Sequence, residues 1–196
     1  GTRPEAIKLA PLIYAFKKCK KIETRVILTG QHKEMVSQVM KLFDLREDKN
    51  LNIMINKQTL SHITIEILSR LQVEFKNNKP NLVIVQGDTT TAFTSALASF
   101  YEKIPLAHVE AGLRTNDLHN PFPEEANRRL ISQIAKLHFA PSEIARKNII
   151  ASGIKSQIKV TGNTVIDSLL HVKNNLHSKN YFTHLDWDTK NIILIT

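Results

Sequence analysis

The fold is decided by the stretch Asn81-Leu-Val-Ile-Val-Gln86-Gly-Asp-Thr-Thr-Thr91, which begins a segment that continues to position 129. Its apolar run is typical of a buried strand, and the Gly-Asp-Thr run after it is typical of a turn into a helix. A second apolar run ends at Glu110, and Glu124 opens a further helical pattern. We therefore expect Asp88, Glu110 and Glu124 to gather along one edge of a sheet, where open α/β sheets bind ligands.

The remainder of the chain alternates between the two kinds of pattern. Strands are expected at 24–29, 51–55, 82–86, 105–109, 137–140 and 157–160. Helices are expected at 4–18, 33–43, from a turn at 58–61 to about 75, and at 90–101, 124–135, 142–150 and 164–176. Strands that alternate with helices of this length predict a Rossmann-like parallel sheet with helices on both faces.

The two ends of the chain suggest how it is divided. The sequence opens at a loop-to-helix junction, so we expect residues 1–176 to form a Rossmann-like domain whose first, central strand is missing. The polar stretch 177–190 is a linker candidate, and the apolar run at 191–196 reads as the first strand of an absent C-terminal domain.

Composition narrows the class of protein. The formal net charge is +9, but the only cluster of lysines is Lys17-Lys18-Cys19-Lys20-Lys21 and no aromatic residues interleave with it. This pattern favours a generally basic surface that attracts a small phosphorylated anion, rather than a nucleic-acid face. No apolar run approaches the ~18 residues of a membrane span. A single cysteine forms no internal disulfide, which favours a cytoplasmic location.

The first eight residues offer a possible anion site. The backbone N–H groups at a helix N-terminus favour an anion, and Arg3 and Lys8 can add positive charge for a phosphate. The alternative is a solvated capping turn. Phosphate binding and simple capping are equally compatible with these residues alone.

The three acidic positions also have two interpretations. Asp88 could simply cap the helix that follows it, and a helix N-terminus accounts for one of the acidic residues at positions 124 and 125. An ionisable group such as Glu110 at the exit of a buried strand is costly unless it is paired or used. Three such positions on one edge therefore favour acid–base chemistry.

Signatures of a metal or a cofactor do not appear in the sequence. The histidines at positions 32, 108, 119 and 138 lack metal-ligand spacing, and there is neither a G-x-G-x-x-G nor a P-loop motif. We therefore expect no metal and no dinucleotide cofactor.

Seven segments occur in an order that resembles the non-hydrolysing bacterial UDP-N-acetylglucosamine 2-epimerases. They are GTRPEAIKLAPLI, TGQHKEM, VQGDTTT, HVEAGLRT, PFPEEANRRL, LHFAPS and VTGNTVIDSLL. The resemblance covers positions 1 to about 170. It implies the N-terminal domain of a two-domain GT-B-type enzyme that holds UDP-GlcNAc in its cleft and needs no NAD or metal.

The resemblance also assigns roles to individual residues. Arg3 and Lys8 become substrate-binding residues, Asp88 and Glu110 the acid–base carboxylates, and Glu124 a member of the same site. Which carboxylate is the acid stays open. Members of the family also bind a second, activating UDP-GlcNAc. The positions that bind it align with Gln31, Lys57, Gln58 and Glu124 of this chain. The family usually has Arg at the position of Lys57. A homodimeric parent enzyme is also implied.

Two other classes of protein remain open from the sequence. One is a GT-B glycosyltransferase domain, and the other is a non-catalytic fragment that binds a nucleotide sugar. In the resembled family, a histidine in a His-Arg-Arg segment and the uridine-diphosphate pocket follow the strand that matches positions 191–196. We therefore expect the 196-residue chain to be inactive by itself.

Overall fold

The computed structural model describes residues 1–31, 33–115 and 117–175. The helices are α1 (Arg3–Lys18), α2 (Lys33–Leu42), α3 (Leu60–Asn77), α4 (Thr90–Tyr101), α5 (Glu124–Ile134), α6 (Glu143–Ala151) and α7 (Val165–Asn175). The strands are β1 (Ile27–Leu28), β2 (Lys49–Asn50), β3 (Val83–Gln86), β4 (Leu106–Val109), β5 (Leu137–Ala140) and β6 (Gln157–Val160). Helices and strands alternate over most of the described chain, as the sequence pattern predicts.

All strand pairs in the described ranges are parallel. β3, β4, β5 and β6 form a four-stranded sheet in chain order, and β1 pairs with β2 in a second sheet of two strands. The sequence predicted a parallel sheet that lacks its central first strand, and in the described residues β1 and β3 are not hydrogen-bonded to each other. The expectation of a further strand between them remains a prediction.

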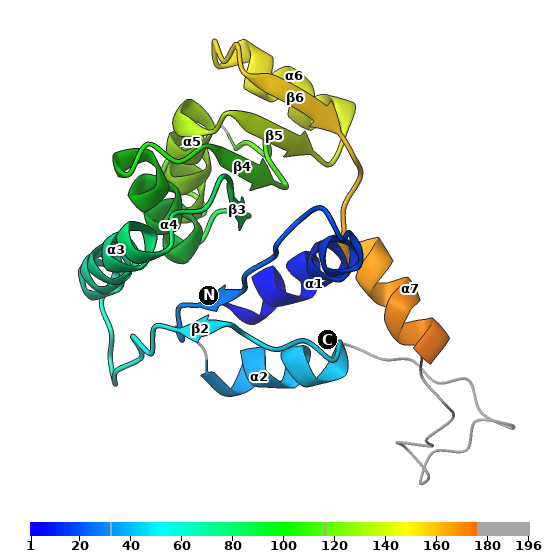
Figure 1. The fold of residues 1–196 in the computed structure, drawn as a ribbon. Helices are drawn as coiled ribbons and strands as arrows, with labels where there is room; N and C mark the ends of the chain where they lie inside the picture. Colours follow the sequence, from blue (N-terminus) through cyan, green and yellow to red (C-terminus); the bar gives the residue numbers. More distant parts are fainter. Residues whose placement is uncertain (32, 116, 176–196) are drawn as a thin grey trace, which may run out of the picture.

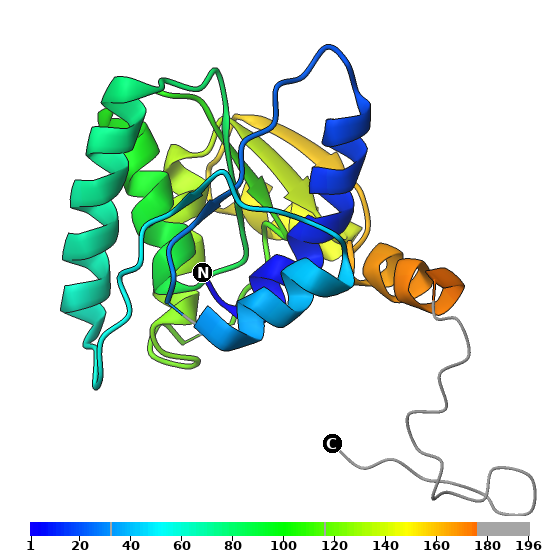
Figure 2. The same ribbon diagram turned by 60° about the horizontal axis from the view of Figure 1, so that its bottom comes forward.

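Helices cover both sides of the four-stranded sheet (Figure 1). α3, α4 and α5 lie to the left of the sheet in that view, and α1 lies below it and to the right. Small side chains allow the close approach of α4, because Ala92 and Ala96 pack with Val85 of β3 and Leu106 of β4 in one buried cluster. Figure 2 shows α1, α2 and α7 grouped on one side of the molecule, away from α3.

Two further apolar clusters support the fold on either side of this sheet cluster. The apolar face of α3 packs on the segment after β2 through a cluster that includes Ile53, Ile67 and Phe75. Ala10 of α1 packs with α2 in another cluster, together with Val39 and Phe43. These contacts fix α1 and α3 on opposite sides of the sheet edge that carries the acidic residues.

The predicted strand at 51–55 is wrong. The structure assigns the strand to Lys49–Asn50, and Asn52 has a positive φ of 51°, which interrupts the extended conformation. The backbone N–H groups of Leu51 and Ile53 nevertheless donate to carbonyl oxygens of Leu28 and Thr29. The predicted strand at 24–29 is likewise reduced to Ile27–Leu28.

Helix ends agree with the sequence to within one or two residues, and α3 begins at Leu60, within the predicted turn at 58–61. Side-chain oxygens of Thr59, Thr89 and Ser142 accept N–H groups in the first turns of α3, α4 and α6. The proposed linker at 177–190 and the strand at 191–196 lie outside the described residues. None of the described helices is both long and apolar enough to cross a membrane.

Candidate active site

The acidic edge forms where β3 and β4 end. Gln86 and Val109 are partners in the parallel register, and the Gly87 N–H donates to the Val109 carbonyl oxygen at 3.0 Å. Asp88 and Glu110 therefore leave the sheet from neighbouring strands. Gly87 has φ 73° and Glu110 has φ 63°, so both strands end in a left-handed residue that turns the chain sharply at this edge.

Glu110 is held by donors from three segments. Lys8 Nζ of α1 lies 2.6 Å and 2.7 Å from the two carboxylate oxygens. Gln86 Nε2 donates to Oε2, and Asn163 Nδ2, from the loop before α7, donates to Oε1 at 2.9 Å. Every one of these groups is a donor, and the side chain is only 11% exposed. The surroundings therefore suit an ionised carboxylate.

Asp88 has a different set of partners. Its Oδ2 lies 2.6 Å from Arg128 Nη2 of α5, and its backbone oxygen accepts from Asn127 Nδ2 at 2.8 Å. The helix-capping interpretation of Asp88 is wrong, because Thr89 is the N-cap of α4 and its hydroxyl accepts the Ala92 N–H at 3.1 Å. The Asp88 side chain therefore does not cap α4, and it contacts Arg128 at the carboxyl-terminal edge of the sheet.

The electrostatics of the edge raise the proton affinity of Asp88. Burial raises the pKa of Asp88 above its ordinary value, and the negative charges of Glu124 and Glu110 raise it further. The Arg128 guanidinium acts in the opposite direction and is outweighed. Glu124 is the first residue of α5 and is half-buried, so the third predicted acidic residue lies close enough to influence Asp88.

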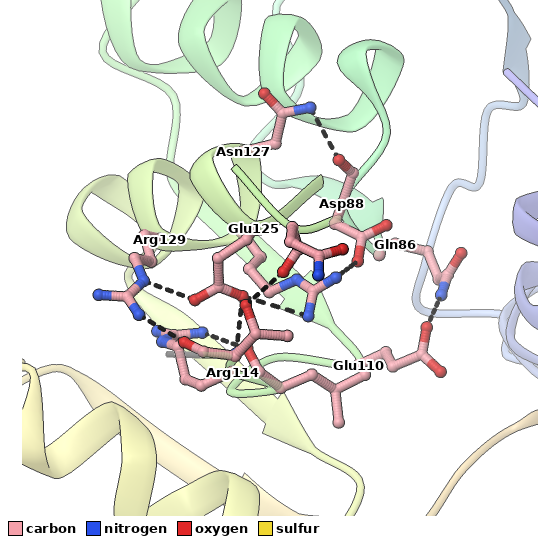
Figure 3. A network of polar contacts seen from close by, with 12 residues as sticks. Gln86, Asp88, Glu110, Arg114, Glu125, Asn127 and Arg129 are labelled. Carbon is pink, nitrogen blue, oxygen red and sulfur yellow. Dashed lines mark hydrogen bonds and ion pairs between the residues drawn. The ribbon is translucent and has the colours of Figure 1, made fainter. Parts of the chain in front are cut away.

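A buried carboxylate lies behind Asp88 (Figure 3). Glu125 is 0% exposed; its Oε2 lies 3.3 Å from Arg128 Nη1, and its Oε1 accepts from Arg129 Nε at 2.6 Å. It also accepts the backbone N–H of Thr115 at 3.0 Å. Arg128 therefore bridges a fully buried carboxylate and Asp88, so the position of Asp88 depends on this group of ion pairs.

His108 supports the same turn from inside the sheet. The residue is fully buried on β4, and its Nε2 lies 2.7 Å from the Gly87 carbonyl oxygen. Burial lowers the pKa of His108 to about 4, so the ring is neutral near pH 7 and its Nε2–H donates to that oxygen. The turn that carries Asp88 is thereby attached to the neighbouring strand.

The start of α1 is joined to the start of α4. Glu5 is buried and accepts from the backbone N–H and the hydroxyl of Thr2, which is a capping box. The Thr89 hydroxyl donates to the other Glu5 oxygen at 2.6 Å. Arg3, the first residue of α1, is exposed beside this junction, whereas Lys8 is paired with Glu110.

The residues predicted for a second substrate site are partly assembled. Gln58 Nε2 donates to the Gln31 backbone oxygen at 3.3 Å, and the Gln31 side chain accepts from the Thr91 hydroxyl at 2.5 Å. Thr91 belongs to the first turn of α4, directly after the acidic turn. Lys57 is exposed next to Gln58 and has a positive φ of 55°.

Sequence reasoning missed several residues of the site. Gln86, Asn163 and Arg128 carry no spacing signal, since a single amide at a strand end or in a loop, or a guanidinium on a helix, has no characteristic sequence pattern. Their only signal was their position inside or beside the motifs that end each strand. Within the described ranges, no group of three or more His, Cys, Asp or Glu side chains could hold a metal ion.

The geometry defines a Rossmann-like α/β protein with two carboxylates and a lysine at the carboxyl ends of parallel strands. The sequence model of UDP-N-acetylglucosamine 2-epimerase matches residues 14–196. The chain belongs to this family. The family resemblance drawn from the seven segments is confirmed.

The chain is also similar in sequence to individual members of this family. The chain is 50% identical over 179 residues to UDP-N-acetylglucosamine 2-epimerase of Escherichia coli K12, covering 91% of this chain and 48% of that protein. It is 47% identical over 198 residues to a Thermotoga maritima protein named as a putative enzyme of the same kind, covering 100% and 52%. The chain thus spans about half the length of the curated relatives it matches.

Solved structures give the same result for the fold. The Neisseria meningitidis UDP-GlcNAc 2-epimerase bound to UDP-GlcNAc superposes with a TM-score of 0.84 at 51% identity, covering 87% of this chain and 46% of that one. The Methanocaldococcus jannaschii enzyme in complex with UDP-GlcNAc and UDP gives 0.82 at 40% identity, covering 87% and 47%. The predicted fold class, an α/β domain of the GT-B type, is confirmed.

Proposed function

We propose that this chain is the N-terminal part of an enzyme that interconverts UDP-GlcNAc and UDP-ManNAc. The observation that carries the proposal is the pair of carboxylates, Asp88 and Glu110, on neighbouring strand ends of a chain in the epimerase family. The reaction inverts C2 of the sugar. The C2 proton is not acidic, because no carbonyl group adjoins that carbon, so simple deprotonation is disfavoured.

Elimination and re-addition avoid this difficulty. The C1–O bond to UDP breaks and its electron pair leaves with UDP, while C2 loses its proton and a C1–C2 double bond forms. The products are UDP and 2-acetamidoglucal. A proton is then added to the other face of C2, and UDP is added back to C1. The product is UDP-ManNAc, the C2 epimer. Two carboxylates suit this route when their surroundings push their proton affinities apart.

The contacts favour distinct roles for the two groups. Glu110, surrounded by Lys8, Gln86 and Asn163 as donors, is suited to remain an anion and to stabilise positive charge developing at C1. Asp88, whose pKa is raised by burial and by its acidic neighbours, is suited to take or return the C2 proton on one face of the sugar, and the opposite face requires a different proton donor or acceptor. Glu124 adds negative charge that keeps the proton affinity of Asp88 high.

The basic residues then divide between the substrate and the catalytic group. Arg3 is exposed at the N-terminus of α1, where the backbone N–H groups and the helix dipole favour a phosphate. Lys8 lies one and a half turns further along the helix, and its contact with Glu110 makes it a charge partner of that carboxylate. A substrate phosphate at the same edge would share the lysine with Glu110.

The set Gln31, Lys57 and Gln58 is proposed as part of a second, activating UDP-GlcNAc site. The support is the hydrogen-bonded connection from Gln58 through Gln31 to Thr91 at the start of α4. A ligand that reorients Gln31 would act directly on the helix that follows the Asp88 turn. Titration of initial rates with UDP-GlcNAc tests this site: replacing Thr91 with Val should reduce sigmoidal dependence, and an unchanged curve would contradict the connection.

A homodimeric, cytoplasmic enzyme without a nucleic-acid partner is also proposed. The outer surface of α3 and the end of α4 carry large apolar side chains that are more than half exposed, namely Ile65, Val73, Phe100 and Tyr101. The single cysteine of the chain is consistent with a reducing compartment. Sedimentation of the protein with Ile65 and Val73 changed to Lys should show monomers, and persistence of the dimer would move the interface elsewhere.

One experiment tests the activity itself. The complete open reading frame that contains this chain is expressed and incubated with UDP-GlcNAc, and the products are followed by ¹H NMR. Formation of UDP-ManNAc, with a trace of free UDP and 2-acetamidoglucal, is expected. Transfer of GlcNAc to an acceptor without formation of the epimer would instead identify a glycosyltransferase.

A further inference from the structure

We propose that Asn163 is a positioning residue for Glu110, whose side-chain amide fixes the orientation of the carboxylate from the loop before α7. The inference rests on the proposed epimerase function for its kinetic meaning and on the contacts of Asn163 for its geometry. Asn163 is separated from Glu110 by 53 positions in the chain and follows β6, the outer strand of the four-stranded sheet. Sequence patterns alone give it no catalytic role.

The orientation of the Asn163 amide is fixed by two partners. Its oxygen accepts the backbone N–H of Val165, the first residue of α7, at 3.1 Å. An amide that accepts through its oxygen must present its NH₂ group on the other side, and this group donates to Glu110 Oε1 at 2.9 Å. One side chain therefore forms an Asx turn onto the first N–H of α7 and holds the carboxylate.

The loop that carries Asn163 is itself held in place. Gly162 has φ 78°, a conformation that suits glycine and turns the chain from β6 towards the active-site edge. The Ser168 hydroxyl of α7 donates to the Ile7 backbone oxygen of α1 at 2.5 Å. Lys8, the neighbour of Ile7, is the charged partner of Glu110. The two donors Lys8 and Asn163 thus share one rigid support.

The neutral amide of Asn163 can orient the Glu110 carboxylate without adding positive charge beside it. The charged groups that face Glu110 are Lys8 on α1 and Asp88 after β3, whose pKa the charge of Glu110 raises. Gln86 of β3 and Asn163 add hydrogen bonds without further charge. Lys8 stabilises the anion, while the two amides orient it and leave its negative charge available to the substrate.

Substitutions at Asn163 can separate the Asx turn from contact with the carboxylate. Aspartate and serine side chains both form the same kind of turn with the backbone two residues on, so each can accept the Val165 N–H. Serine is too short to reach Glu110 and removes the donor. Aspartate keeps the shape of asparagine but places a second anion against the Glu110 carboxylate, which disfavours the ionised form of both.

The test compares Asn163→Ser, Asn163→Asp and Asn174→Asp in the complete open reading frame that contains this chain. Asn174 is exposed on α7 and gives a control of the same charge change. Turnover and KM for UDP-GlcNAc are measured across about pH 5 to 9. We expect about tenfold lower kcat for the serine variant, the scale of one hydrogen bond to a charged group, with KM within about twofold of wild type.

The aspartate variant provides the decisive measurement. Its acid limb should move to higher pH by about one unit, so that activity recovers in part on raising the pH, which a folding defect would not produce. Unchanged pH limbs in both variants, or an effect on KM alone, would overturn the role of Asn163. Equal shifts in the Asn174→Asp control would overturn it as well.

A readout independent of activity separates this inference from the proposed function. The side-chain carboxyl ¹³C signal of Glu110, assigned with Glu110→Gln, is titrated by NMR in the wild type and in Asn163→Asp. A titration midpoint that rises in the variant supports the contact even if the wild-type protein forms no UDP-ManNAc. Coincident midpoints would refute it whatever the enzyme does.

Discussion

Glu110 and Asp88 leave neighbouring strands at the same edge, yet their surroundings differ in kind. Glu110 is contacted by one cation and two neutral amides that come from α1, β3 and the loop before α7. Asp88 has one arginine, and that arginine is shared with the fully buried Glu125. The first arrangement orients a carboxylate with several donors, and the second connects a carboxylate to the ion pairs that stabilise the fold.

This difference suggests how one edge can provide two kinds of carboxyl group. Lys8, Gln86 and Asn163 all donate to Glu110, whereas burial together with acidic neighbours raises the pKa of Asp88. Both groups are carboxylates at strand ends, so neither the functional group nor the strand position distinguishes their roles. The predictions below test the comparison, beginning with the largest expected effect.

Removal of either carboxylate should have the largest effect on activity. In the complete enzyme, Asp88→Asn and Glu110→Gln should each lower kcat by about 10²–10⁴-fold, the range for loss of a positioned acid or base. If the two roles differ as proposed, Asp88→Asn should also abolish deuterium incorporation at C2 in D₂O. Near-normal turnover in both variants would contradict the site assignment.

Arg128 should affect stability as well as activity, unlike the donors to Glu110. Arg128→Met leaves the buried Glu125 with Arg129 as its remaining ion-pair partner and should destabilise the protein by roughly 3 kcal/mol. Denaturant unfolding measures this change. Arg146→Met, which removes an exposed ion pair on α6, is the control and should change stability by less than about 0.5 kcal/mol. Equal effects would show that Glu125 does not depend on Arg128.

The His108 contact predicts that stability depends on pH. The pKa of His108 is about 4 in the folded protein, below its ordinary value of 6.5, so the unfolded chain binds more protons between these values. Stability should therefore fall as the pH falls from 6.5 towards 4, and by about 2 kcal/mol between pH 7 and pH 5.

Replacement of His108 tests this dependence. Gln at this position keeps a donor for the Gly87 oxygen but does not titrate. Thermal unfolding at pH 7 and pH 5 should show a smaller loss in His108→Gln than in the wild type, with the exposed His119→Gln as control. An identical loss in all three proteins would assign the acid sensitivity to other groups.

Removal of the Arg3 guanidinium should have the smallest effect. A phosphate contact exists in the ground state as well as the transition state, so Arg3→Ala should raise KM about tenfold with kcat nearly unchanged. Steady-state kinetics with UDP-GlcNAc provide the measurement. A lower kcat at constant KM would instead place Arg3 at the reacting bonds.

The sequence predicted the alternating elements and the acidic edge, because apolar runs and turn residues are local signals. It failed at 51–55, where a left-handed Asn52 interrupts a run that is apolar enough to be a strand. It also gave Asp88 a possible capping role that belongs to Thr89, since either residue can cap and only the backbone geometry distinguishes them.

The partners of the two carboxylates could not be predicted from local patterns. Lys8 meets Glu110 across 102 positions, and Asn163 meets it across 53. Such contacts depend on how α1 and α7 pack beside the sheet, which no spacing rule specifies. The family resemblance could name Lys8 as a binding residue, but it did not reveal that this lysine contacts the carboxylate itself.

Glu5 has a mechanical consequence for the whole edge. One buried carboxylate joins the first turn of α1 to the first turn of α4 through Thr2 and Thr89. The helix that carries Arg3 and Lys8 cannot tilt without pulling on the turn that carries Asp88. The basic and acidic groups of the site are therefore mechanically coupled, so a displacement of α1 is transmitted to the turn that carries Asp88.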